Sequence, residues 1–215
     1  LWLADVMVSG ARWGLGVPQL VHVVDRRGDL NAPRLPARLR TRLTGCLLRR
    51  RGTRMVAVSE ACRQHAIEHL GIEPQRIDTA FNGIEIESLR PGPKRTDGSR
   101  ALRIGALSNL IEEKGLQYLI EAVAMLISQG VCCELRIAGS GPLAQALARD
   151  ARARTIDDQV EFIGHVDSAE AFYRDIDVFT VPSIYAEGLP TTILEAMATE
   201  VPVIATDVGG ATEVV

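Results

Sequence analysis

Residues 186–199 read Ala-Glu-Gly-Leu-Pro-Thr-Thr-Ile-Leu-Glu-Ala-Met-Ala-Thr and stand between two short apolar runs, Val178–Pro182 and Val201–Ala205. Runs of this length and composition predict buried β-strands. Pro190 is expected at the first helical position, because its fixed φ suits a helix and its missing N–H is not needed there. The stretch therefore predicts a strand, a loop, a helix and a second strand.

The predicted helix has an apolar stripe. Its apolar residues recur at helical spacing and are expected to face the core: Ile193, Leu194, Met197 and Ala198. Thr191, Glu195 and Thr199 fall on a different face.

Two carboxylates flank the expected start of this helix, Glu187 in the loop and Glu195 in the helix. The free amides of Thr191 and Thr192 lie at the helix N-terminus, which is an anion-binding end. The segment thus predicts a phosphate site with one acid on each side. A sugar nucleotide needs that combination, with donors for its diphosphate and acceptors for its hydroxyls. The alternative is an amphipathic helix whose acids are only solvated.

The glutamate pair, separated by seven residues, resembles the E-x7-E signature of the retaining GT-B glycosyltransferases of family 4. The flanking stretches 181–183, 202–206 and 209–215 fit the same pattern in order and spacing. The resemblance covers residues 55–215 well and 1–54 loosely. It implies an α/β fold of GT-B type, in which the C-terminal domain is a Rossmann-like, doubly wound parallel sheet. The last part of a Rossmann-like N-terminal domain would precede it.

The chain order supports this division. Residues 1–90 are expected to be a partial N-terminal, acceptor-side domain, and the turn-forming, charged stretch 91–100 a linker. From residue 101 strands alternate with helices, which predicts a doubly wound sheet and a nucleotide-sugar-binding domain over 101–215. The chain starts without Met and stops in an expected helix, so a fragment with a truncated C-terminus is expected.

The other predicted elements follow from periodicity and turn signals. Helices are predicted at Leu1–Leu15, Glu60–Leu70, Gly115–Gln129, Pro142–Arg152 and Ser168–Asp175. Strands are predicted at Val17–Val24, Met55–Ser59, Ile77–Phe81, Leu102–Leu107, Cys132–Ala138 and Gln159–Ile163, with a tight turn at Asn82-Gly83.

The resemblance also implies site residues. The loop 107–115 resembles the R-L-x-x-E-K-G loop that binds the donor diphosphate, with Lys114 matching and Asn109 standing where Arg is usual. Glu187 is the implied catalytic residue, contacting hydroxyls of the donor sugar, and Glu195 the ligand of the ribose hydroxyls. The remaining implied donor-binding residues are Gly188, Leu189, Thr191, Thr192 and His165. In the N-terminal part, Val24-Asp25 stands where the family often has a His.

The implied reaction moves a sugar from a nucleotide-diphosphate donor to an acceptor hydroxyl with retention, as a hexosyltransferase does. Fixed donors would stabilise the charge that builds on the leaving diphosphate. No acidic pair of metal-binding type stands beside the phosphate site, so no required metal and no other cofactor are predicted. A glycan, a lipid-linked or a small-molecule acceptor is expected, and its identity stays open.

Three alternatives remain. One is a sugar-nucleotide epimerase of the same architecture, and another is a non-catalytic sugar-nucleotide-binding protein. The third is a nicotinamide-dependent oxidoreductase, to which the G-x-G-x-x-A pattern at 139–144 gives weak support because it follows the wrong strand. The family instead suggests a structural turn there. Glu200 stands where Gly is expected, and a positive φ there would cost on the order of 1 kcal/mol.

Composition sets outer bounds. The chain has 215 residues, 47% hydrophobic and 24% charged, and a net charge of −3 that gives no overall attraction to nucleic acid. The apolar residues 1–24 leave no uncharged span of about 20 residues and show no signal-peptide pattern. The four cysteines have no metal-ligand or framework spacing, which indicates reduced thiols, so a cytoplasmic location is expected. Arg34–Arg54 holds eight arginines and no acid. It predicts either a solvated helix or peripheral contact with the inner face of a membrane. The set Cys62, His65 and His69 could in principle hold a metal, although no fourth ligand is visible.

Overall fold

The computed structural model describes residues 19–23, 53–89, 91, 101–185 and 187–215. The chain divides into two compact units. Unit 1 comprises Leu1–Asn82 with Ala186–Leu189, and unit 2 comprises Gly83–Tyr185 with Pro190–Val215. Several sequence predictions lie outside the described residues: the helix Leu1–Leu15, the pair Val24-Asp25, nearly all of Arg34–Arg54 and nearly all of the linker 91–100. The domain limits inferred from sequence therefore stay a prediction.

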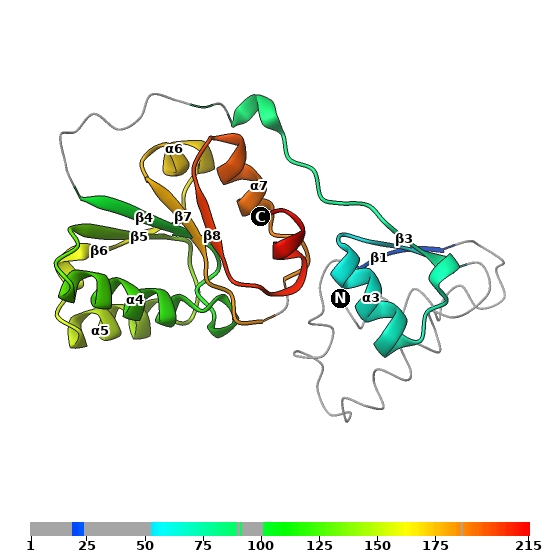
Figure 1. The fold of residues 1–215 in the computed structure, drawn as a ribbon, viewed down its shortest axis with the longest axis horizontal. Coiled ribbons are helices and arrows are strands. Elements are labelled where there is room, and N and C mark those ends of the chain that lie inside the picture. The colour runs from blue at the N-terminus through cyan, green and yellow to red at the C-terminus, as the bar shows by residue number, and fades with distance from the viewer. Residues whose placement is uncertain (1–18, 24–52, 90, 92–100, 186) are drawn as a thin grey trace. The chain divides into compact units, whose positions relative to one another are not determined.

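Unit 2 is built on a five-stranded parallel sheet in the order β6-β5-β4-β7-β8 (Figure 1). Its strands are β4 (Leu102–Leu107), β5 (Cys133–Ala138), β6 (Val160–Gly164), β7 (Val178–Val181) and β8 (Val203–Ala205). The chain moves outward from β4 to β6, then returns to the other side of β4 for β7 and β8. Ile104 of β4 accordingly pairs with Leu135 of β5 and with Val178 of β7. This order confirms the predicted doubly wound sheet and places its switch point between β4 and β7.

Helices cover the two faces of this sheet (Figure 1). They are α4 (Leu116–Ser128), α5 (Ala144–Ala153), α6 (Ala169–Arg174) and α7 (Thr191–Ala198). One buried cluster joins α4 and α5 to β4, β5 and β6, and a second joins α6 and α7 to β7. The inward stripe predicted for α4 is confirmed at Leu116, Leu119, Ile120 and Val123, which are all buried. Cys133, the first residue of β5, is buried, and Cys132, just before the strand, is exposed.

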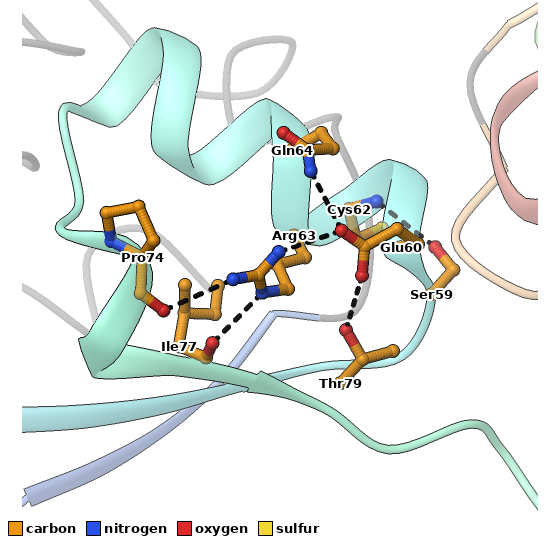
Figure 2. Close-up of polar contacts among 8 residues, drawn as sticks. All are labelled: Ser59, Glu60, Cys62, Arg63, Gln64, Pro74, Ile77 and Thr79. Carbon is orange, nitrogen blue, oxygen red and sulfur yellow. Dashed lines mark hydrogen bonds and ion pairs between the residues drawn. The ribbon is translucent and has the colours of Figure 1, made fainter.

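Unit 1 contains a three-stranded parallel sheet in the order β1-β2-β3, against which helix α3 packs. These elements are β1 (Gln19–Val23), β2 (Thr53–Ala57), α3 (Glu60–Leu70) and β3 (Ile77–Thr79). As predicted, Ser59 caps α3, since its Oγ accepts from the Cys62 amide at 3.1 Å, and Gly71 ends it with φ 66°. Figure 2 shows how side chains then fix the helix to β3.

Glu60 and Arg63 make these contacts. The Glu60 carboxylate accepts from Arg63 and Gln64, both at 2.8 Å, and from the Thr79 hydroxyl at 2.9 Å. Arg63 also donates to the Ile77 carbonyl at 3.1 Å. Burial alone would raise the pKa of Glu60, but these hydrogen bonds and the charge of Arg63 together outweigh it, so the pKa lies below its ordinary value.

The start and phase of α7 differ from the prediction. Pro190 is the residue before the helix, with an extended ψ of 108°, rather than its first residue. Ile193 and Ala196 are the fully buried side chains, whereas Met197 is 49% exposed. Helix α7 packs against both β7 and β8. The side chain that faces these strands is the small Ala196, which allows close packing, and the larger Met197, predicted to face the core, points away from it. Thr199, expected away from the core, is also buried, and its hydroxyl donates to the Ala196 carbonyl at 2.8 Å.

The predicted tight turn at Asn82-Gly83 is wrong. Strand β3 ends at Thr79, and the residues after it run without a turn up to a short 3-10 helix at Ile86–Ser88. The Asn82 side chain instead donates to the Leu189 carbonyl at 3.1 Å. The sequence predicts Asn82 as a turn residue, whereas in the structure its amide group binds the segment that ends at Leu189, which belongs to unit 1.

Candidate functional site

The loops that follow β4 and β7 are locked together at the carboxyl edge of the unit 2 sheet. The Ile184 amide, beyond β7, donates to the Glu113 carbonyl, beyond β4, at 2.9 Å. Gly115 has φ 66°, and a Cβ on it would lie 1.9 Å from the Pro182 carbonyl oxygen. This approach requires glycine, both for its φ and for the missing side chain. The two loops are thus held as one rigid surface at the edge where ligands bind in such sheets.

Lys114 and Asn109 lie in the first of these loops, as predicted. Lys114 is half-buried and ends the 3-10 turn Glu112–Lys114, which precedes α4. Asn109 is exposed. The neighbouring Leu110 amide donates to the Ser140 carbonyl at 2.9 Å, which ties this loop to the one after β5.

The glycine pattern at 139–144 has a packing role. Gly139 has φ 125°, and a Cβ there would lie 1.9 Å from the Ser108 carbonyl oxygen. A Cβ on Gly141 would lie 2.5 Å from the Leu110 carbonyl oxygen. Both glycines are needed because the loop after β5 lies directly on the backbone of the loop after β4. The pattern needs no dinucleotide to explain it.

His165 follows β6 and is exposed at the same edge. The preceding Gly164 has φ 78°, and its carbonyl accepts from the Gly139 amide at 2.6 Å. The loops after β4, β5, β6 and β7 therefore form a chain of backbone contacts along one edge of unit 2.

Helix α7 begins at this edge too. Its first intrahelical donor is the Ile193 amide, which bonds to the Pro190 carbonyl at 3.2 Å. The amides of Thr191 and Thr192 come before it, at the end of the helix that favours anions. Glu195 is half-buried one turn further on, and its Oε2 accepts from the Tyr173 hydroxyl at 2.9 Å.

Glu187, Gly188 and Leu189 are all buried, and the segment that contains them is grouped with unit 1. Glu187 is 8% exposed, which is rare for a carboxylate without a specific role or partner. The hydrogen bond from Asn82 to the Leu189 carbonyl fixes the end of this segment. The predicted site residues are therefore divided between the units: these three lie in unit 1 and the others in unit 2.

Two residues that the sequence prediction did not include contribute to the candidate site. Asn82 orders the segment of Glu187, and Tyr173 contacts Glu195. Tyr173 is fully buried, and burial, with the nearby Glu195 carboxylate, raises the pKa of its hydroxyl. The sequence offered one indication of this role: Tyr173 stands at an apolar position of a predicted helix, and a buried tyrosine hydroxyl usually needs a hydrogen-bond partner.

Side chains that could bind a metal are not gathered into a site in the part of the chain that the structure describes. There, no group of three or more His, Cys, Asp or Glu side chains is arranged to hold an ion. Of the candidate set in α3, His65 and His69 stack with ring centroids 4.4 Å apart, and Cys62 is buried. Among the helices of the described residues, none has the length and apolar composition of a membrane span.

Comparison with known proteins adds an independent observation. Residues 100–215 match the family described as "Glycosyl transferases group 1". Over 173 residues the chain is 33% identical to the putative colanic acid biosynthesis glycosyltransferase WcaL of Escherichia coli, covering 77% of this chain and 42% of WcaL. It is 30% identical over 163 residues to the putative glycosyltransferase EpsF of Bacillus subtilis, covering 72% of this chain and 42% of EpsF. The chain thus spans well under half the length of these relatives.

Solved structures agree in fold. HepE of Anabaena, crystallised in complex with UDP and glucose, superposes with a TM-score of 0.85 at 22% identity, covering 100% of this chain and 60% of HepE. A glycosyltransferase from Rickettsia africae gives a TM-score of 0.69 at 19% identity, covering 99% of this chain and 64% of the other.

Proposed function

The chain belongs to the family of group 1 glycosyltransferases, and from this premise we propose that it forms the donor-binding part of a retaining family 4 enzyme. The enzyme moves a sugar from a nucleotide-diphosphate sugar to an acceptor hydroxyl in the synthesis of a polysaccharide, another glycan or a glycolipid. The name of the relative WcaL refers to colanic acid biosynthesis, which favours a polysaccharide product.

One observation carries the donor site. The loop with Lys114 is fixed to the loop after β7 by the Ile184–Glu113 hydrogen bond and by the close approach of Gly115 to Pro182. The loop after β7 leads directly to Glu187 and then to α7, which carries Glu195. A cationic side chain and a helix N-terminus thus belong to one carboxyl edge of the sheet, a combination suited to a diphosphate.

Each residue then has a proposed role. Lys114, with the Thr191 and Thr192 amides, binds the diphosphate and stabilises the negative charge that grows on it as the sugar leaves. Asn109 contributes a neutral hydrogen bond in the same loop. Glu195 accepts from the ribose hydroxyls, and His165 lines the base.

The proposed role of Glu187 is catalytic. Its carboxylate would accept from hydroxyls of the donor sugar, with the backbone of Gly188 and Leu189 beside it. A carboxylate that is 8% exposed is shielded from water, so its interactions with a bound sugar would be stronger than at the surface. The proposal includes no metal, because Lys114 and backbone amides would supply the positive charge.

Isothermal titration of the complete protein with UDP, GDP and ADP tests the donor site. We expect one of the three to bind with a micromolar to millimolar Kd, equally with EDTA and with Mg²⁺. Glu195→Ala should weaken binding about tenfold or more, because a hydrogen bond to a charged group contributes about 1.5–3 kcal/mol. Glu121→Ala, which changes an exposed glutamate on α4, is the matched control and should leave Kd unchanged.

Binding that Glu195→Ala leaves intact would contradict the assignment of this site, and binding that requires Mg²⁺ would contradict the absence of a metal. Product analysis then separates the alternatives. Transfer to an acceptor or slow donor hydrolysis excludes a non-catalytic binding protein, whereas conversion of the donor into its epimer would identify an epimerase.

A further inference from the structure

We propose that Tyr173 is a positioning residue that holds Glu195 in the orientation in which it binds the ribose. The inference rests on the proposed function, in which Glu195 is the ribose ligand. Tyr173 lies in α6, 22 residues before Glu195, and belongs to none of the sequence motifs that predict the donor site.

The contact geometry supports this role. The Tyr173 hydroxyl lies 2.9 Å from Glu195 Oε2 and 3.2 Å from the Thr192 carbonyl oxygen, and it donates toward both. It therefore contacts the carboxylate and the first turn of α7 together. A carboxylate accepts at both of its oxygens, so with Oε2 held by Tyr173 we assign Oε1 to the ribose hydroxyls.

The hydroxyl itself is fixed in place. The Tyr173 ring is fully buried and packs edge-to-face on Phe172 and Phe179, with centroid distances of 5.8 and 5.2 Å. Such contacts leave the ring no alternative orientation without repacking the core. Glu195, by contrast, is half-buried, and its unbranched side chain has several rotatable bonds. By holding the Glu195 carboxylate in one orientation before the nucleotide binds, the fixed Tyr173 hydroxyl reduces the conformational entropy that Glu195 loses on binding.

Substituting Phe at this position removes one oxygen and keeps the ring. In the complete protein, Tyr173→Phe should weaken binding of the best ligand among UDP, GDP and ADP about fivefold. It should not weaken binding of the 2′,3′-dideoxy form of the same nucleotide, which lacks the hydroxyls that Glu195 would contact. Tyr118→Phe, an exposed tyrosine of α4, is the matched control and should change neither.

A double-mutant comparison gives the decisive readout. In a Glu195→Ala background, Tyr173→Phe should cause no further loss of affinity, because the hydroxyl then has no carboxylate to hold. Additive losses, or equal losses for the nucleotide and its dideoxy form, would show that Tyr173 acts on the general structure, and would overturn the inference.

The experiments distinguish failure of the proposed donor site from failure of the positioning role of Tyr173. If Glu195→Ala weakens binding but Tyr173→Phe does not, the positioning role is wrong and the donor site stands. If Glu195→Ala has no effect, the donor site fails and the inference fails with it. The wild-type protein gives a second measurement that does not depend on a variant folding. The ring-carbon resonance of labelled Tyr173 should shift with the nucleotide and not with its dideoxy form, and equal shifts would count against the inference.

Discussion

At the residue scale, Gly115 shows how one position couples the fold to the candidate site. Its φ of 66° is open to other residues at a moderate cost. A Cβ there, however, would lie 1.9 Å from the Pro182 carbonyl oxygen, and such a contact cannot be relieved without moving backbone. The loop that carries Lys114 therefore depends on glycine for its place against the β7 loop.

Gly130 offers a matched comparison, because its φ is 83° and a Cβ there would meet nothing within 4 Å. We expect Gly130→Ala to lower the free energy of unfolding by about 1 kcal/mol, and Gly115→Ala by about 3 kcal/mol, since the second adds a backbone clash to the same φ cost. Urea unfolding at constant m-value measures both. Equal losses would contradict a role for the close approach. Gly115→Ala should also weaken nucleotide binding, whereas Gly130→Ala should not.

Glu200 shows what a single residue could reveal from sequence. The sequence indicated a position that prefers glycine, and the structure has Glu200 at φ 59°, so the positive φ is confirmed. Tyr173 could not be identified in the same way. Its partner depends on how α6 and α7 lie against each other, and no spacing along the chain encodes the contact between residues 173 and 195.

At the element scale, the attachment of α3 to β3 should depend on pH. The pKa of Glu60 is lowered in the folded state, so its contribution to stability is fully present above the ordinary value of 4.5. That contribution is lost as the pH falls through the lowered folded value. Because the Glu60 side chain is 46% exposed, solvent screening limits the effect to on the order of 0.5 kcal/mol.

Thermal unfolding between pH 3 and pH 7 tests this expectation. Glu60→Gln should lower stability at pH 7 and remove part of the decline that the parent protein shows below pH 4.5. Glu68→Gln on the same helix, where the side chain is 65% exposed and lies 4.0 Å from His69, is the control and should change the profile less. An identical decline in the parent and in Glu60→Gln would show that other carboxylates cause it.

The elements were predictable to within about two residues because apolar runs and caps mark them. The strand Leu102–Leu107 and the helix Glu60–Leu70 agree with the prediction at both ends. The buried face of α7 was not predictable. Which of Ala196 and Met197 faces the sheet depends on how closely the helix packs on β7 and β8, and spacing alone leaves both possible.

At the scale of the whole molecule, the α/β class and the doubly wound order followed from the alternation of strands and helices, and similarity to solved glycosyltransferase structures of the GT-B type confirms the fold. The assignment of Ala186–Leu189 to unit 1 was not predictable. Sequence continuity suggests that Glu187 and Glu195 belong to one unit, whereas the hydrogen bond between Asn82 and Leu189 joins positions 107 residues apart. Residue roles in the site remain predictions.

The distribution of aromatic residues gives a whole-molecule test of where a nucleotide binds. All three tyrosines fall between residues 118 and 185, in unit 2, so tyrosine absorbance follows the unfolding of that unit. A donor site at Lys114 and Glu195 should stabilise the tyrosine-reported transition by about 2.7 kcal/mol at a nucleotide concentration of about 100 Kd.

Arg34–Arg54 provides the competing explanation, because eight arginines without an acid attract any polyanion. Nucleotide held there by charge alone would be released by salt, since interactions between charges in water are largely screened beyond about 10 Å at 0.1 M salt. We expect the stabilisation of the tyrosine-reported transition to persist at about 0.3 M NaCl and in EDTA. Nucleotide binding that leaves the tyrosine-reported transition unchanged and is lost in salt would assign binding to the arginine-rich stretch and would contradict the donor site.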